Sequence, residues 1–136
     1  MATYEGRIVG NNIVNPDAPQ TADYLTVPRC VFTTPAMASV GYSRQEAEAK
    51  GLKYQVKFND LKDWRSAKTY AERAAISKVL IEDGSERILC AHLLGHGAPE
   101  TIHIFALAMK HDISAAELGN TVYAYPTFTS DIKNMI

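Results

Sequence analysis

A four-residue turn between two apolar runs constrains the fold of this chain more than any other feature of its sequence. Residues 76–82 and 87–94 are rich in aliphatic side chains and are separated by Asp83-Gly84-Ser85-Glu86. An Asp-Gly pair readily adopts the left-handed backbone that a tight chain reversal requires, so the pattern predicts a β-hairpin. The central element of the predicted fold is therefore a pair of antiparallel strands.

Three further segments have the character of strands. Residues 27–35 begin and end near prolines, and residues 38–42 form a short successor. Residues 52–58 alternate apolar and polar side chains, which places Tyr54, Val56 and Phe58 on one face; we expect this face to meet a core. The polar residues 59–73 predict a long surface connection with Trp64 as its anchor.

Two capping boxes mark the starts of short helices. Ser43 precedes Glu46 by three residues, and Ser114 precedes Glu117 by the same spacing. In each pair the serine can accept a backbone N–H of the first turn while the glutamate reaches back to the serine N–H. The sequence therefore predicts helices that start at residues 44 and 115.

A longer helix is predicted over residues 99–111. Pro99 suits the first helical position, and Glu100 complements the positive end of the helix dipole. The apolar residues of this segment form a stripe that is wider than one core face needs. The extra width indicates a second surface that meets a partner. A last helix is predicted near the C-terminus.

Composition and charge limit the classes of function. The 136 residues suit one domain with a loosely attached end, because residues 14–24 read as a linker and the preceding residues 1–13 contain two glycines that weaken a helix. With 14 basic and 15 acidic residues mixed along the chain, neither nucleic acid nor an anionic membrane is an expected partner. There is no run of membrane-spanning length and no signal segment, so we expect a cytoplasmic protein. Cys30 and Cys90 read as two buried reduced thiols.

Three ordered segments resemble a known family. FTTPAMASVGYSRQEAEAKG at 32–51, RILCAHLLGHGAPETIH at 87–103 and AELGNTVYAYPTFTSDI at 116–132 are similar to the C-terminal dimerisation domain of the pyridine nucleotide-disulfide oxidoreductases, which include glutathione reductase, dihydrolipoamide dehydrogenase and mercuric reductase. The resemblance implies an α+β domain over residues 25–136, with a four- to five-stranded, largely antiparallel sheet and helices packed on it. Residues 1–24 resemble a remnant of the preceding FAD-domain helix plus a linker.

The resemblance also implies a function. The chain is expected to be the interface domain of a flavin-dependent NAD(P)H oxidoreductase, with a homodimer partner and with upstream FAD and NAD(P)H domains in the same polypeptide. The family's glycine-rich nucleotide loops and its redox-active disulfide are not among these residues, so the isolated chain is expected to hold no cofactor and to be inactive. In the whole enzyme, Thr33, Thr34 and Pro35 are expected to approach the flavin. The side chains expected at the dimer interface are Ile102, Phe105, Ala106, Met109, Tyr125 and Pro126.

One expected catalytic pair is altered. The disulfide-reducing members carry a histidine before Pro-Thr and a glutamate five residues later. Here Tyr125 occupies the histidine position, Ser130 occupies the glutamate position, and Asp131 lies one residue late. An imidazole titrates near ~6.5 and a phenol near ~10, so a tyrosine at this position is expected to donate a hydrogen bond and not to act as a base. A purely structural role for Tyr125, as an aromatic residue before a proline, has equal weight at this point.

Three other functions compete with this one. His92, His96 and His103 could suggest a metal site, but no acidic or cysteine cluster completes one. An autonomous enzyme that uses His92 and Tyr125 would lack a nucleophile and a phosphate loop. The main alternative is a free-standing protein-interaction module that keeps the fold without redox chemistry.

Overall fold

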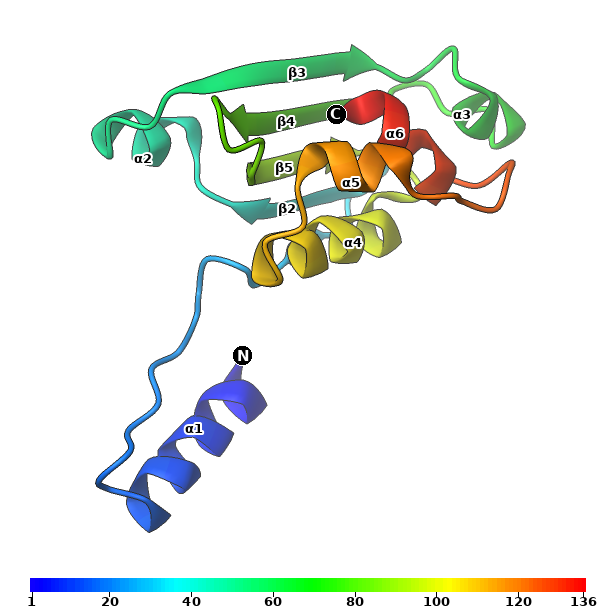
Figure 1. The fold of residues 1–136 in the computed structure, drawn as a ribbon. Coiled ribbons are helices and arrows are strands. Elements are labelled where there is room, and N and C mark those ends of the chain that lie inside the picture. Colours follow the sequence, from blue (N-terminus) through cyan, green and yellow to red (C-terminus); the bar gives the residue numbers. More distant parts are fainter.

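A five-stranded antiparallel sheet with helices packed on it forms the body of the protein (Figure 1). The computed structural model describes residues 1–136. The strand order is β1-β2-β5-β4-β3, and each neighbouring pair is antiparallel. The predicted α+β fold is confirmed. The elements are α1 (Ala2–Val14), β1 (Arg29–Val31), β2 (Met37–Gly41), α2 (Arg44–Ala49), β3 (Tyr54–Asp60), α3 (Arg65–Thr69), β4 (Ile76–Glu82), β5 (Ile88–Leu94), α4 (Ala98–Lys110), α5 (Ala115–Asn120), the 3-10 helix η1 (Thr129–Asp131) and α6 (Ile132–Met135).

The hairpin predicted from Asp83-Gly84 is confirmed as β4 and β5. Gly84 has a φ of +83°, a left-handed conformation that glycine adopts without steric cost. The N–H of Glu82 donates to the carbonyl of Arg87 at 2.9 Å, and the side chains of these two residues form an ion pair at 2.9 Å. Backbone and side-chain interactions therefore close the hairpin at the same point.

Both capping boxes are confirmed. The Ser43 hydroxyl accepts the Glu46 N–H at 3.2 Å, and the Glu46 carboxylate accepts the Ser43 N–H at 2.7 Å. Ser114 and Glu117 make the same reciprocal bonds at 3.2 and 2.8 Å. Because these bonds satisfy N–H groups that have no partner inside a helix, they fix the starts of α2 and α5.

The two faces of the sheet are covered unequally. Helices α4, α5 and α6 lie on one face (Figure 1), where Val79 and Ala91 are fully buried together with Phe105 of α4. On the opposite face, α2 covers one corner, where Leu80 and Cys90 are fully buried beneath Ala47. The main core therefore lies between the sheet and the three later helices.

The expected core-facing side of residues 52–58 is wrong for two of its three members. Strand β3 lies at the edge of the sheet, and the side chains of Val56 and Phe58 are 46% and 62% exposed. Only Tyr54 packs against the small cluster under α2. Val56 pairs with Leu80 and Phe58 with Lys78, on the face that α4 to α6 do not cover. Alternation thus predicted the pleat of the strand correctly, but not which face is covered.

Helix α4 buries much of its wide apolar stripe inside this chain. Ile102 and Phe105 are fully buried and Ala106 is nearly so, because they pack into the main core. Ile102 and Phe105 therefore pack inside this chain, whereas Ala106 keeps a small exposed area that lines a surface groove; the place of these three residues at a dimer interface stays a prediction. Met109 is partly buried, and Leu107 is the large apolar side chain of α4 that faces outward, with 52% exposure.

Helix α1 lies apart from the sheet and has no buried residue (Figure 1). Its two glycines do not prevent it from forming. The helix is held to the following linker, since the Tyr4 hydroxyl accepts the N–H of Asp23 at 2.9 Å and Asn12 exchanges hydrogen bonds of 2.8 and 3.0 Å with the backbone of Gln20. We call α1 with residues 15–24 the arm. No helix of the structure is long and apolar enough to cross a membrane.

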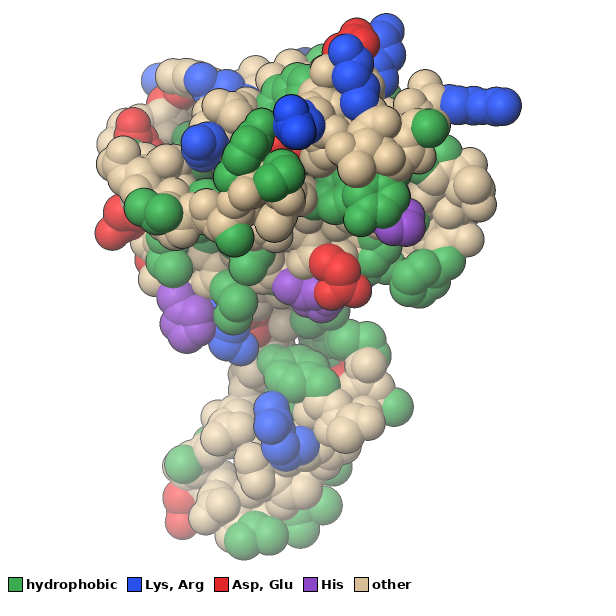
Figure 2. All heavy atoms as spheres, turned by 90° about the vertical axis from the view of Figure 1, so that its right-hand side faces the viewer, with side chains coloured by type: hydrophobic (Ala, Val, Ile, Leu, Met, Phe, Trp, Pro, Cys, Tyr) green, Lys and Arg blue, Asp and Glu red, His purple; other side chains and the backbone are tan.

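Figure 2 shows charges of both signs interspersed over one side of the molecule, with the arm as a separate lower lobe. Hydrophobic side chains lie between the charges and at the junction of the two lobes. On this side of the molecule, no single sign of charge dominates.

Candidate functional site

Tyr125 lies on an exposed segment between α5 and η1. Its side chain is 70% exposed, and it precedes Pro126 through a cis peptide bond. Ser130 and Thr127 hold the segment in place: the Thr127 N–H donates to the Ser130 hydroxyl at 3.2 Å, and that hydroxyl donates to the Thr127 carbonyl at 2.6 Å. The phenol is therefore presented to solvent by a turn that is fixed by its own hydrogen bonds.

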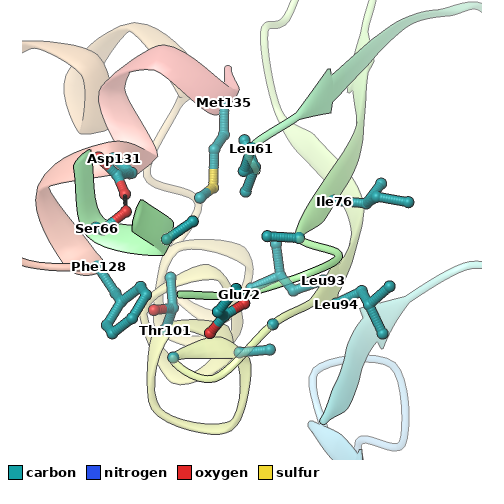
Figure 3. Close-up of a pocket in the computed structure, with 15 residues that line it drawn as sticks. Leu61, Ser66, Glu72, Ile76, Leu93, Leu94, Thr101, Phe128, Asp131 and Met135 are labelled. Carbon is teal, nitrogen blue, oxygen red and sulfur yellow. Dashed lines mark hydrogen bonds between the residues drawn. The ribbon is translucent and has the colours of Figure 1, made fainter. Parts of the chain in front are cut away.

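Neither candidate partner for Tyr125 faces it. Ser130 is 3% exposed, and its hydroxyl is occupied by the Thr127 backbone. Asp131 accepts a hydrogen bond from Ser66 of α3, as Figure 3 shows. Burial raises the pKa of the Asp131 carboxyl, against the lowering effect of the Ser66 hydroxyl. No hydrogen bond therefore joins the phenol of Tyr125 to the carboxylate of Asp131.

An aromatic cluster anchors this segment to the body. The ring of Tyr70 stacks on that of His96, with centroids 4.8 Å apart, and lies 5.2 Å from that of Phe128. A Cβ on Gly97 would come within 2.3 Å of the Phe128 ring, so only glycine allows this close approach. Sequence reasoning missed the cluster because its members come from three separate parts of the chain.

A carboxylate lies beside this cluster in a small cavity. One carboxylate oxygen of Glu72 accepts the backbone N–H of His96 at 2.5 Å, while its other oxygen is buried without a hydrogen-bond partner. The cavity has a volume of about 30 Å³, and Figure 3 shows Thr101 next to Glu72 on its wall. This volume suits one water molecule, not an organic ligand.

Thr33, Thr34 and Pro35 line a larger cleft of about 820 Å³. The Thr33 hydroxyl donates to the Pro35 carbonyl at 2.7 Å, which shapes the turn. Two exposed aromatic side chains, Phe32 and Tyr70, line the same cleft. The cleft is open to solvent and has the size of a small-molecule site.

The histidines and cysteines lie in separate environments. His92 is half-buried on the face of the sheet that α4 to α6 do not cover. Burial lowers its pKa, and Lys78 lowers it further. His96 and His103 are exposed, and no group of three or more histidine, cysteine or acidic side chains is placed to hold a metal ion. Cys30 and Cys90 are both free, and burial raises the pKa of the Cys90 thiol to about 11.

Comparisons with known proteins place these features in a family. Residues 27–136 match the family model described as the pyridine nucleotide-disulphide oxidoreductase dimerisation domain. The chain is 38% identical, over its whole length, to an uncharacterized 19.7 kDa protein in the mercuric resistance operon of Staphylococcus aureus, of which it covers 75%. It is 31% identical over its whole length to mycothione reductase of Mycobacterium tuberculosis, and 35% identical over 82% of its length to human mitochondrial dihydrolipoyl dehydrogenase.

The chain spans only a minor part of the reductases that it matches. The chain spans 31% of mycothione reductase and 22% of human dihydrolipoyl dehydrogenase. An HOCl-induced flavoprotein disulfide reductase of Escherichia coli has the same fold, with a TM-score of 0.83 over 94% of this chain and 29% of its own, at 22% identity. The chain belongs to the pyridine nucleotide-disulphide oxidoreductase family, and residues 27–136 are its dimerisation domain.

Proposed function

We propose that this chain is the interface domain of an FAD-dependent NAD(P)H oxidoreductase that uses Tyr125 where the family's disulfide reductases use histidine. The observation that carries the proposal is the presentation of Tyr125: a fixed turn exposes its phenol, and Asp131, the nearest acidic residue in the sequence, is hydrogen-bonded to Ser66 instead. A phenol is in general a hydrogen-bond donor and a weaker candidate than an imidazole for moving protons between thiols. The proposed terminal acceptor is therefore not an ordinary disulfide.

The residues of this chain fit a contact with FAD but not its binding. The cleft lined by Thr33, Thr34 and Pro35 is open to solvent, and in this proposal it offers a wall to one ring system of FAD. FAD would supply the electron transfer between NAD(P)H and the acceptor. In this proposal residues 33–35 contact the flavin edge, and upstream domains of the same polypeptide hold FAD and NAD(P)H.

The proposed assembly is a homodimer in the cytoplasm. Within it, the outer face of α4 and the segment with Tyr125 and Pro126 contact the second subunit. The burial of Ile102, Phe105 and Ala106 narrows the α4 contribution to the side chains that point outward, of which Leu107 is the large apolar one. The family description as a dimerisation domain supports this assembly.

Light scattering of the chain over a concentration series, with FAD added in parallel, tests the assembly. A dimer whose mass and affinity do not respond to FAD is expected. A monomer that binds FAD would contradict the proposal.

For Tyr125, the test is turnover of the full-length reductase with Tyr125→Phe, which removes only the hydroxyl. We expect loss of turnover with the native acceptor, and unchanged turnover on every accepted substrate would contradict a chemical role.

A free-standing interaction module is the second candidate function. The observation in its favour is that the chain covers 75% of a curated protein of only 19.7 kDa, which is far shorter than the reductases. The coding sequence upstream of Met1 separates the candidates. Glycine-rich nucleotide-binding motifs in frame support the reductase, whereas a native start at Met1 supports the module.

A further inference from the structure

Gly97, at the start of α4, is required for the space that it leaves free and not for its backbone conformation. Its φ of −81° and ψ of −2° lie in the right-handed region that other residues adopt, unlike the four glycines of this chain with a positive φ. The three atoms nearest to a Cβ at this position all belong to Phe128, at 2.3, 2.6 and 2.7 Å. The start of α4 and the Phe128 ring therefore fit together only while position 97 has no side chain.

Two more rings lie against Phe128. The Tyr70 ring is 5.2 Å from it and the His96 ring 6.0 Å, and these two rings stack on each other. Glu72 holds the backbone of His96 through the hydrogen bond described above. The Phe128 ring thus contacts both the start of α4 and the connection from α3 to β4, and these two parts of the body fix its place.

Phe128 is only three residues from Tyr125, and hydrogen bonds stiffen the segment that joins them. The Thr127 hydroxyl donates to the carbonyl of Ala124 at 2.7 Å and accepts the Ser130 N–H at 3.1 Å. The first of these bonds closes a loop around Tyr125. A displacement of the Phe128 ring is therefore passed on to the phenol and is not absorbed by a flexible linker.

The same rings border the cleft at residues 33–35. Tyr70 and His96 both line this cleft, and both also lie against Phe128. A continuous series of contacts therefore runs from the cleft through these two rings to Phe128, and from there through the stiff turn to Tyr125. The two parts of the chain to which the proposed function gives a role are joined by this series.

We propose that Phe128, seated against Gly97, is a positioning residue that fixes the Tyr125 phenol relative to the cleft at residues 33–35. The inference rests on the proposed function, in which the phenol serves the acceptor and the cleft contacts the flavin edge. It adds the contact that sets the place of the phenol. Phe128 acts through Tyr125, and a misplacement of about 1 Å is sufficient to matter for such a group.

Paired substitutions in this chain test the contact. Gly97→Ala is expected to lower the thermal midpoint by about 5 °C, because the added methyl group displaces the ring. In a Phe128→Ala background, the same substitution is expected to change the midpoint by less than about 1 °C, since the space is then empty. Gly119→Ala is the matched control, because the nearest atom to its new methyl group, Cδ1 of Ile136, is 3.9 Å away. An equal loss for Gly97→Ala with and without the Phe128 ring would overturn the contact.

Hydrogen exchange measured by mass spectrometry tests the effect on the turn. Two backbone N–H groups within residues 124–131 are bonded to side-chain oxygens of the turn in the unmodified chain. Gly97→Ala and Phe128→Ala are each expected to raise exchange in this segment about tenfold, and Phe128→Leu less, because it keeps an apolar side chain. Val122→Ala, at a side chain that is 95% exposed just before the segment, is expected to change nothing. Unchanged exchange in the Gly97 and Phe128 variants would overturn the positioning role.

Fluorine NMR of the chain with 3-fluorotyrosine at its seven tyrosines observes the phenol itself. Each signal is assigned by its loss in the corresponding Tyr→Phe variant. Gly97→Ala is expected to shift the signals of Tyr70 and Tyr125 and to leave that of Tyr54, which packs under α2, unchanged. A shift of Tyr70 alone would show that the Phe128 ring packs without positioning the phenol, and would overturn the inference.

These measurements separate the inference from the proposed function, because they need neither acceptor nor cofactor. If Tyr125→Phe leaves the turnover of the full-length reductase unchanged while Gly97→Ala shifts the Tyr125 signal and loosens the turn, the chemical role of the phenol falls and its positioning by Phe128 stands. If Tyr125→Phe abolishes turnover while Gly97→Ala changes neither the signal nor the exchange, the proposed function stands and this inference falls. Circular dichroism of each variant confirms that the rest of the fold is retained.

Discussion

The two faces of the sheet are formed by the same strands but are covered by helices to different extents. The face under α4, α5 and α6 carries the main core, with Val79, Ala91 and Phe105 at no measurable exposure. The other face has one corner under α2 and otherwise leaves Phe58 and Met37 more than half exposed. The difference teaches that hydrophobic alternation reports which side chains share a face. Whether that face is covered depends on helices that lie far away in the sequence.

The largest expected effect contrasts two phenylalanines, one on each side of the sheet. Phe105→Ala empties a fully buried site and is expected to lower the free energy of unfolding by about 3–5 kcal/mol. Phe58→Ala, at 62% exposure, is expected to lower it by less than about 0.5 kcal/mol. Urea unfolding monitored by circular dichroism measures both. Similar losses for the two variants would show that the second face is buried in solution.

An intermediate effect is expected from the two helix caps. Ser43→Ala and Ser114→Ala should each destabilise their helix by about 1 kcal/mol through the loss of the capping bond. Only Ser43→Ala should also uncover Cys90, because α2 is the cover over that corner. The rate at which a thiol reagent labels Cys90 is then expected to rise about fivefold. Mass spectrometry identifies the labelled cysteine, and an equal rise in Ser114→Ala would contradict the assignment of α2 as the cover.

The smallest expected effect is a pH dependence of stability that arises from His92, on the face of the sheet that α4 to α6 do not cover. Burial and Lys78 lower the pKa of His92, so the folded protein binds a proton at this site less readily than the unfolded chain does. The stability contributed by neutral His92 is therefore complete above the unfolded pKa of about 6.5 and is lost as pH falls below it. Thermal unfolding between pH 7.5 and 5.5 should show a steeper loss in the native chain than in His92→Gln. Parallel curves would show that His92 is fully hydrated.

The local elements were predictable because their signals are local. The Asp83-Gly84 turn and the capping boxes at Ser43 and Ser114 each involve residues within four positions of one another, and the structure contains all three. The fold class followed from the resemblance. Val56 and Phe58 were misplaced because nothing within β3 indicates that the covering helices lie on its other side.

The candidate site was predictable only in part. The resemblance predicts that Tyr125 stands where the disulfide-reducing members carry a histidine, and Ser130 where they carry a glutamate, and both assignments stay predictions. The inward turn of Ser130 depends on its hydrogen bond to Thr127 within the turn. The contact of Asp131 with Ser66 spans 65 positions of the sequence, so no local pattern indicates it. The groove between α1 and α4 joins residues about 100 positions apart, which no motif records.

The strand order has a consequence for how copies of this chain can assemble. The sheet ends in β1 and β3, so each copy has two different edges with unpaired backbone groups. Pairing β3 of one copy with β1 of the next would be heterologous and could continue without limit, as in a filament. β1 is only three residues long and is preceded by Pro28, and β3 carries Lys57 and Asp60. The short β1 edge with its proline and the charged β3 edge both disfavour such growth, in agreement with the closed twofold pair proposed above.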